Sequence, residues 1–246
     1  QQAKTDLRLA DIQAGGLHNA IPREASCVVS VPYAYKEQIR VDWNIFQADV
    51  EEEYSRTEKT MEFILESVDA PDSVVDKKTA RNLILALQAV DNGIFAMCQD
   101  IDLVETSSNL ASIRKNAEER TIVVNSSQRS SILSARHNMA ATFRAPFELA
   151  GAEVVSGEGY PGWKMNPNSK LLVVAVEQYR KLYGKEPFVG GIHAGLECGL
   201  FSEKFPGMDM VSVGPTMRGV HSPDERMLIP SVQLVWDHLL AILANI

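Results

Sequence analysis

The sequence predicts a mixed α/β and α+β fold in two parts. The first part, roughly residues 1–155, reads as an antiparallel sheet with helices on one face, and the second part reads in α/β order. Short β-branched or alternating apolar runs, such as residues 24–31, are typical of strands. Apolar residues at helical spacing, around Leu83 and Leu87, indicate amphipathic helices. A segment rich in turn formers at 160–167 separates the two parts.

Local signals set the elements expected in the first part. Pro32 ends the second strand, and Gly151 stops the last helix in the manner of a left-handed cap. Met61, Phe63 and Leu65 alternate along one face, which predicts a strand. In chain order we expect strands over 7–13 and 24–31, a helix over 34–53, a strand over 59–66, a long helix that follows Ser73 and carries Leu83, Ile84, Leu87, Val90 and Ile94, strands over about 102–113 and 119–128, and a helix over 132–150.

The second part alternates helices with apolar runs that are bounded by turns. We expect a helix over 169–183, a strand over 188–192, a helix near 199–205, a strand over 208–213 and a helix over 231–244. Sheets in α/β order place their sites in the loops at strand ends. The loops that follow the two strands, at 193–195 and 218–225, are therefore the expected location of a functional site.

Composition excludes several classes of function. Hydrophobic residues make up 45% of the chain and charged residues 23%, which is ordinary globular usage. A net charge of −8 without a lysine or arginine run argues against a nucleic-acid partner. No apolar stretch approaches the roughly 18 residues needed to cross a bilayer. The three cysteines, Cys27, Cys98 and Cys198, are odd in number and scattered, which fits reduced thiols in a cytoplasmic protein.

Histidines provide the strongest chemical signal. His221 lies in the loop RGVHSPDE, where Asp224 or Glu225 can accept the second ring N–H and so fix the tautomer for metal binding. A surface-loop histidine without a role is the alternative that the residues alone leave open. His193 reads either as a group that supports a site or as a structural histidine. His137 and His238 lie on predicted helices and are expected to be solvated.

Six blocks span nearly the whole chain: GGLHNAIPREA at 15–25, ETSSNLASI at 105–113, the serine- and arginine-bearing strand at 123–131, YPGWKMNPNS at 160–169, HAGLECGLF at 193–201 and VGPTMRGVHSPDERM at 213–227. In sequence and in order, these blocks resemble the aminoacylhistidine (Xaa-His) dipeptidases. Those enzymes are cytosolic di-zinc peptidases related to the carboxypeptidase G and aminoacylase group. The blocks HAGLECG and HSPDE carry the resemblance most specifically.

The resemblance implies a division into two domains. Residues 1–158 correspond to the inserted lid, an α+β sandwich that closes over the metal centre, and residues 159–246 to the C-terminal part of the α/β catalytic domain. It also implies that the general base and most metal ligands belong to an N-terminal segment absent from this sequence. The expected activity, zinc-dependent hydrolysis of Xaa-His dipeptides, therefore belongs to a full-length parent. This chain alone is expected to be inactive, because one histidine cannot hold two zinc ions.

The resemblance also assigns roles to four residues. His221 matches a ligand of the co-catalytic zinc pair, whose ions lie about 3.5–4 Å apart and activate a shared water. Asn19, Arg129 and Gly195 match substrate-binding positions. Arginine suits the free carboxylate of a dipeptide, and glycine allows a close backbone approach. The alternatives are a turn-forming asparagine, a surface arginine and a helix-entry glycine. His18 departs from the family, where relatives often carry arginine, and residues 106–109 have no assigned role.

Two alternative functions stay open at this level. A related aminoacylase or carboxypeptidase would use the same metal centre on another substrate. A non-catalytic interaction module is the other alternative, because lid domains in this superfamily often mediate dimerisation. The expected partners are a dipeptide substrate and a second copy of the chain in a homodimer, with neither nucleic acid nor membrane.

Overall fold

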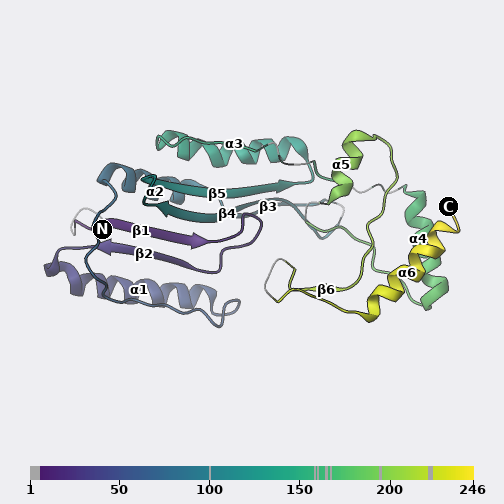
Figure 1. The fold of residues 1–246 in the computed structure, drawn as a ribbon, viewed down its shortest axis with the longest axis horizontal. Coiled ribbons are helices and arrows are strands. Elements are labelled where there is room, and N and C mark those ends of the chain that lie inside the picture. The colour runs from purple at the N-terminus through teal and green to yellow at the C-terminus, as the bar shows by residue number, and fades with distance from the viewer. Residues whose placement is uncertain are drawn as a thin grey trace. The chain divides into compact units, whose positions relative to one another are not determined.

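The computed structural model describes residues 6–99, 101–157, 159, 161–163, 166, 168–193, 196–220 and 224–246. It confirms the predicted fold class, a mixture of helices and antiparallel sheet (Figure 1). The chain forms two compact units, which are assembled from interleaved segments. Unit 1 comprises Gln1–Ala89, Ala111–Asn125 and Pro146–Ala152, and unit 2 comprises Val90–Leu110, Ser126–Ala145 and Glu153–Ile246. The domain boundary at 158/159 stays a prediction.

Unit 1 begins with the expected antiparallel pair. Strand β1 (Arg8–Gly15) pairs with β2 (Ala25–Ser30), which lies beside it in Figure 1. In this antiparallel pair Ile12 lies opposite Cys27. The register shifts between Leu9 and Asp11, which marks a bulge. The two strands are close in sequence, and along this register the backbone N–H and C=O groups of each strand bond to those of the other.

A glycine closes β1 where that strand meets the next one. Gly15 has φ +59°, and a Cβ built there would lie 2.0 Å from the carbonyl oxygen of Ala111. Its N–H donates to the carbonyl of Glu24 at 3.0 Å. Only a residue without a side chain fits this conformation and this approach, so the first glycine of the GGLHNAIPREA block fixes where the following turn begins.

Strands β4 (Val104–Asn116) and β5 (Thr121–Ser130) form near the two expected positions, 102–113 and 119–128, and they pair with each other as a long hairpin. Both strands contribute residues to both units. In unit 1, β4 pairs with β1 through Ser112, Ile113 and Arg114. In unit 2, it pairs with β3 (Gly93–Met97) through residues 104–108. The sequence did not predict β3.

The helix before β3 is shorter than predicted. Helix α2 spans Lys77–Ala89, so Ile94 belongs to β3 and not to the helix. The carboxylate of Asp76, not Ser73, caps its start by accepting from the N–H groups of Lys78 and Thr79. Hydrogen bonds from Thr79 hold the pKa of the exposed Asp76 carboxyl below its ordinary value. The bond from the Thr79 side chain has the larger effect, and the bond from its backbone follows.

The predicted strand at 59–66 is wrong. Residues 61–70, all described, carry neither strand nor helix. Phe63 instead packs edge-on against Trp43 and Phe46 of helix α1 (Lys36–Tyr54), with ring centroids 6.3 and 6.4 Å away. A short 3-10 turn, η1 (Tyr33–Tyr35), precedes that helix. Of the three alternating apolar residues, Phe63 packs on a helix, whereas Leu65 is exposed.

Each unit has its own small core. Helix α3 (Leu133–Leu149) ends at Gly151, whose φ of +85° confirms the left-handed cap. Within unit 1 the side-chain amide of Asn82 donates to the carbonyl of Ala150 at 3.0 Å, which ties α2 to the end of α3. Buried apolar residues include Leu9, Ala10, Ala86, Ala111, Ile113 and Phe147 in unit 1 and Met139, Phe143, Ala175 and Ile242 in unit 2.

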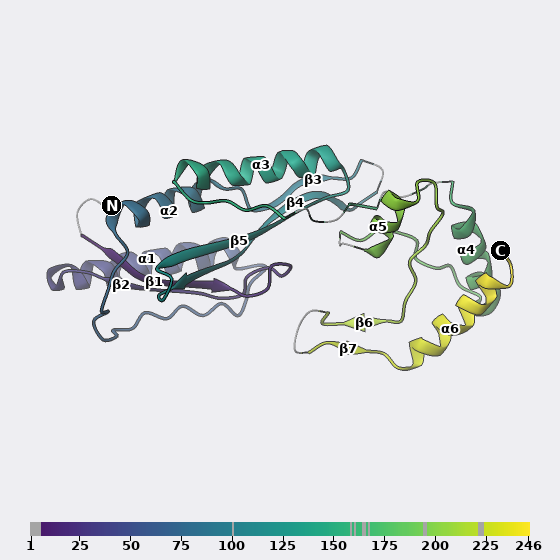
Figure 2. The same ribbon diagram turned by 45° about the horizontal axis from the view of Figure 1, so that its top comes forward.

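In unit 2, helix α4 (Lys170–Tyr183) packs beside α6 (Pro230–Leu243), as both views show (Figures 1 and 2). Ser169 caps α4, and its hydroxyl accepts from the N–H of Leu172. His238 lies in this helix pair with its Nε2 2.8 Å from the carbonyl of Ala175. It is buried, so the prediction of a solvated His238 is wrong. The contact with α4 covers the face of α6 that carries His238, a face that was expected to be exposed to solvent.

Two further predicted strands are absent from the described residues. Residues 188–192 and 208–213 carry no strand, although helix α5 (Glu197–Lys204) forms between them as expected. A two-residue hairpin, β6 (Met217–Arg218) with β7 (Arg226–Met227), follows. Apolar runs become strands only when a neighbour takes up their backbone N–H and C=O groups. No described helix is long and apolar enough to cross a membrane.

Candidate functional site

The β4–β5 hairpin presents two different faces. On one face, the hydroxyls of Thr106 and Ser130 lie 2.9 Å apart, and the Gln128 amide donates to Ser108 Oγ at 3.3 Å. Thr106, Ser108 and Ser130 are buried. Successive side chains of a strand point to opposite faces, so Ser107 and Arg129 share the other face.

That second face holds His193, the first residue of the HAGLECG loop. Its Nε2 lies 2.6 Å from Ser107 Oγ, and its carbonyl accepts from Arg129 Nη1 at 3.2 Å. One strand therefore holds the side chain of His193, and its neighbour holds the main chain of the same residue. All three residues belong to unit 2.

The surroundings of His193 favour a neutral imidazole. Burial lowers the pKa of His193 below its ordinary value of 6.5, and the positive charge of Arg129 lowers it further. A hydrogen bond to the Val104 backbone opposes these two effects without cancelling them. A neutral ring suits a fixed hydrogen-bonding role, because it offers one donor and one acceptor.

A third block joins this cluster through two glycines. A Cβ on Gly162 would lie 3.0 Å from the carbonyl oxygen of Ser130, at the end of β5. A Cβ on the buried Gly199 would lie 2.2 Å from the carbonyl oxygen of Pro161. Within the turn-rich block, Gly162 thus lies against the end of β5, and Pro161 lies against helix α5. Blocks far apart in the sequence meet within unit 2.

The structure describes two of the four predicted site residues, Arg129 and Asn19. Arg129 lies at this cluster, bound to the HAGLECG loop. Asn19 lies in unit 1, half-buried in a turn in which the N–H of Ala20 donates to the carbonyl of Leu17 at 3.2 Å. Gly195 and His221 lie outside the described residues. Among the described residues, Arg129 is the predicted substrate-binding residue whose hydrogen bond to the HAGLECG loop is seen.

The metal prediction depends on His221. Strands β6 and β7 flank its loop on either side, and Asp224 and Glu225 lie in the same loop. Within the described part of the chain, no group of three His, Cys, Asp or Glu side chains could hold a metal ion. The described residues by themselves therefore do not make up a zinc centre.

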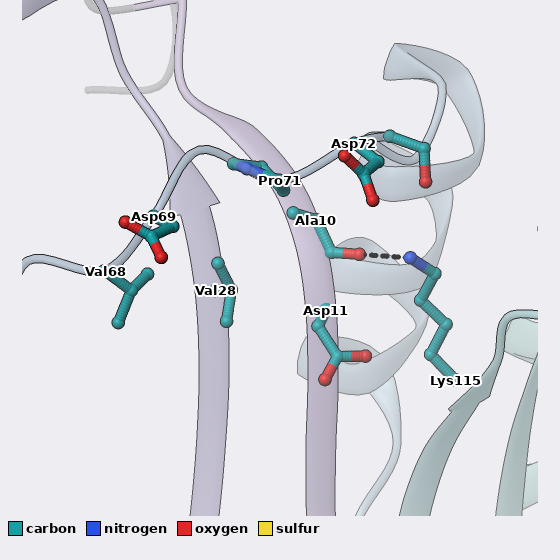
Figure 3. A pocket seen from close by; sticks show the side chains of 9 residues that line it. Ala10, Asp11, Val28, Val68, Asp69, Pro71, Asp72 and Lys115 are labelled. Carbon is teal, nitrogen blue, oxygen red and sulfur yellow. Dashed lines mark hydrogen bonds between the residues drawn. The ribbon is translucent and has the colours of Figure 1, made fainter.

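A separate cavity of about 470 Å³ lies in unit 1, between the β1–β2 pair and residues 68–73 (Figure 3). Its polar lining includes Asp11, Asp69 and Asp72, and Lys115 Nζ donates to the carbonyl of Ala10. Neither Asn19 nor Arg129 lines it.

Sequence reasoning left Ser107 and His193 without assigned roles. The signal that finds them is the pairing of β4 with β5. Once Thr106 faces Ser130 and Ser108 faces Gln128, Ser107 must stand beside Arg129 on the opposite face. That pairing cannot be read from either strand alone.

Comparisons with known proteins relate the chain to dipeptidases. No protein-family model matches the chain. The cytosol non-specific dipeptidase of Escherichia coli (strain K12) is 35% identical over 243 residues, which cover 98% of this chain and 50% of that protein. The crystal structure of aminoacylhistidine dipeptidase from Vibrio alginolyticus matches with a TM-score of 0.83 and 36% identity, over 100% of this chain and 50% of that chain.

A more distant structure shares the fold alone. Aminopeptidase PepT from Bacillus cereus ATCC 10987 matches with a TM-score of 0.50 and 18% identity, over 66% of this chain and 44% of that chain. The chain spans about half the length of the dipeptidases that it matches. Over essentially its whole length, this chain is homologous to the cytosol non-specific and aminoacylhistidine dipeptidases.

Proposed function

We propose that the full-length protein hydrolyses dipeptides, Xaa-His dipeptides among them, with zinc as its metal and in the cytoplasm. The observation that carries the proposal is the double contact of His193 with Ser107 and Arg129. It joins the signature loop to the strand whose arginine suits a substrate carboxylate. Homology to two dipeptidases over 98% and 100% of the chain supports the same class of reaction.

In this proposal, Arg129 binds the free carboxylate of the dipeptide. A guanidinium offers five N–H donors in a planar fork that matches the two carboxylate oxygens. The bond from Arg129 Nη1 to the His193 carbonyl uses one of these donors and orients the group. Asn19 and Gly195 complete substrate binding through a side-chain amide and a backbone N–H.

His221 is proposed as a zinc ligand, with the remaining ligands and the general base supplied by the part of the parent that this chain does not span. Residues 1–158 act as the lid and residues 159–246 as part of the catalytic domain. The 246-residue chain by itself is expected to be inactive, because two zinc ions need more ligands than one histidine provides.

A broader substrate range is the second candidate. The Escherichia coli relative is named a non-specific dipeptidase, while the Vibrio alginolyticus relative is named for aminoacylhistidine substrates. A site that holds the backbone carboxylate through Arg129 recognises a group common to all dipeptides. Preference for histidine would then require separate contacts with the imidazole.

The deciding experiment measures hydrolysis of carnosine, a second Xaa-His dipeptide and a dipeptide without histidine by the full-length protein. Each is assayed with zinc and after chelation. His221→Ala is compared with His137→Ala, a matched change at an exposed position of α3. We expect zinc-dependent turnover that falls at least roughly 1000-fold in His221→Ala and is unchanged in His137→Ala.

Any other result would contradict part of the proposal or favour one of the alternative functions. Turnover that ignores His221→Ala would remove the ligand assignment. A protein that binds zinc but cleaves only acylated amino acids or longer peptides would indicate an aminoacylase or carboxypeptidase. Zinc-dependent turnover by the 246-residue chain alone would contradict its expected inactivity, and failure of every substrate would favour an interaction module. Sedimentation of the same protein would test the proposed homodimer.

A further inference from the structure

We propose that Ser107 and His193 form a positioning pair that fixes the guanidinium of Arg129 for the substrate carboxylate. The use of the pair rests on the proposed function, whereas the pairing itself is a property of the folded chain. Neither residue is expected to touch the reacting atoms. Their role is to hold one carbonyl, that of His193, where Arg129 can bind it.

The geometry gives His193 the two attachments that this role needs. Its side chain is fixed on β4 by Ser107 Oγ, 2.6 Å from Nε2, and its carbonyl receives Arg129 Nη1 at 3.2 Å. A carbonyl whose own side chain is fixed is a rigid acceptor. A mobile loop would provide an acceptor that moves with the arginine instead of restraining it.

Rigidity matters because an arginine side chain is long. Ordering it costs roughly 2 kcal/mol of rotamer entropy, and a substrate that must order it bears that cost on binding. Arg129 is anchored before substrate arrives, because one N–H is already held by the loop. Removing the support of the loop would return part of this cost to the substrate, as a higher KM.

The direction of the Ser107–His193 bond follows from the surroundings. The imidazole also bonds the Val104 backbone, and its partly buried setting beside Arg129 favours the neutral ring. A neutral ring that keeps its proton toward the Val104 carbonyl presents an unprotonated Nε2 to Ser107. We therefore assign the hydroxyl of Ser107 as the donor. The substitution Ser107→Thr would preserve that donor, and Ser107→Ala would remove it.

Matched variants on the two faces of β4 test the pair in the full-length zinc-loaded protein. Ser107→Ala removes the hydroxyl that faces His193, Ser107→Thr restores it, and Ser108→Ala removes the neighbouring hydroxyl, which binds Gln128 on the opposite face. Each is assayed with carnosine and with carnosine amide, which lacks the free carboxylate. Nitrogen-15 resonances of the His193 ring, identified with His193→Gln, are recorded without substrate.

We expect Ser107→Ala to raise KM for carnosine roughly 3- to 10-fold, the range for loss of one hydrogen bond, with kcat within about twofold. KM for the amide should not change, Ser107→Thr should recover the wild-type KM, and Ser108→Ala should leave KM unchanged. The ring resonances of His193 should shift in Ser107→Ala only.

Two results would overturn the inference. Unshifted ring resonances in Ser107→Ala would show that the pair does not form in solution. Shifted resonances with an unchanged carnosine KM, or an equal KM change for the amide, would show that the pair forms but does not position Arg129 for the carboxylate. If wild-type protein cleaves no dipeptide, the proposed function has failed and the positioning role fails with it, while the resonances still decide whether the pair exists.

Discussion

The two segments of the β1–β2 hairpin and residues 188–192 were all predicted to be short strands. Only the segments of the hairpin form strands. Strand β1 finds its partner ten residues further along the chain, in β2, and their backbones pair from Arg8 opposite Ser30 to Ala14 opposite Ala25. Residues 188–192 have no such partner in the described chain, and Phe188 is 93% exposed. Strand formation depends on a neighbour at least as much as on the residues of the strand.

The same contrast holds for residues 208–213, where Met208 and Val213 are also exposed. Apolar side chains that remain in water contribute little to stability, whereas Leu9, Ala111 and Ile113 of the paired sheet are removed from it. The paired region should therefore be sensitive to substitution, and the unpaired segments should be tolerant. Three measurements test this difference between the two regions.

The largest effect is expected at the end of β1. Gly15→Ala would place a Cβ 2.0 Å from the Ala111 carbonyl oxygen and force a side chain into φ +59°. We expect a loss of roughly 4 kcal/mol in the free energy of unfolding, measured by urea denaturation. The control is Gly16→Ala, where a Cβ would meet nothing within 4 Å, with a change below about 1 kcal/mol. Equal effects at both positions would contradict the close approach of β1 to β4.

A pair of isoleucines tests the two regions directly. Ile113 in β4 is 6% exposed, and Ile192 in the unpaired segment is 61% exposed. Ile113→Ala should cost roughly 2–4 kcal/mol, since it opens a cavity in a core, and Ile192→Ala less than about 0.5 kcal/mol. Both are measured by urea denaturation of the 246-residue chain. A comparable loss in Ile192→Ala would mean that the unpaired segment is packed in solution.

The smallest effect concerns pH. The folded pKa of His193 lies below 6.5, so the unfolded chain binds more protons as pH falls through that value. Stability from this group is complete above about pH 6.5 and is lost as pH falls toward the folded pKa. Between about pH 7.5 and 5.5, we expect the melting temperature of the wild type to fall further than that of His193→Gln, by on the order of 1 °C.

Calorimetric scans of the two proteins across this range measure the difference. His137→Gln, at an exposed site, serves as the control and should follow the wild type. If His193→Gln loses stability on acidification as steeply as the wild type, the imidazole is not held neutral in the fold.

Local sequence signals predicted most helices of this chain and the strands β1, β2, β4 and β5, but not which strand pairs with which. Gly151 ends α3 and Ser169 begins α4 as expected, because caps and left-handed residues act through their immediate neighbours. The strands at 59–66, 188–192 and 208–213 failed for one reason, which is that an apolar pattern does not specify a partner. Phe63 packs against two aromatic rings of α1, those of Trp43 and Phe46, and does not belong to a strand.

For the candidate site, the residue motifs indicated the dipeptidase relationship, and homology to two dipeptidases confirms it. The motifs also singled out Arg129, which the structure places against the HAGLECG loop. The buried contact of His238 with Ala175 was missed, because the face of a helix that is covered depends on which helix packs against it.

The sequence itself specified the caps at Gly151 and Ser169 and indicated the relationship to the dipeptidases, since a cap depends on residues close together in the chain and the relationship on the order of motifs along it. Which strands pair, which apolar runs become strands, and that Ser107, Arg129 and His193 share one face all follow from the tertiary structure. Those outcomes depend on contacts across 64 and 86 residues of chain, and a contact at that distance is set by the packing of whole elements.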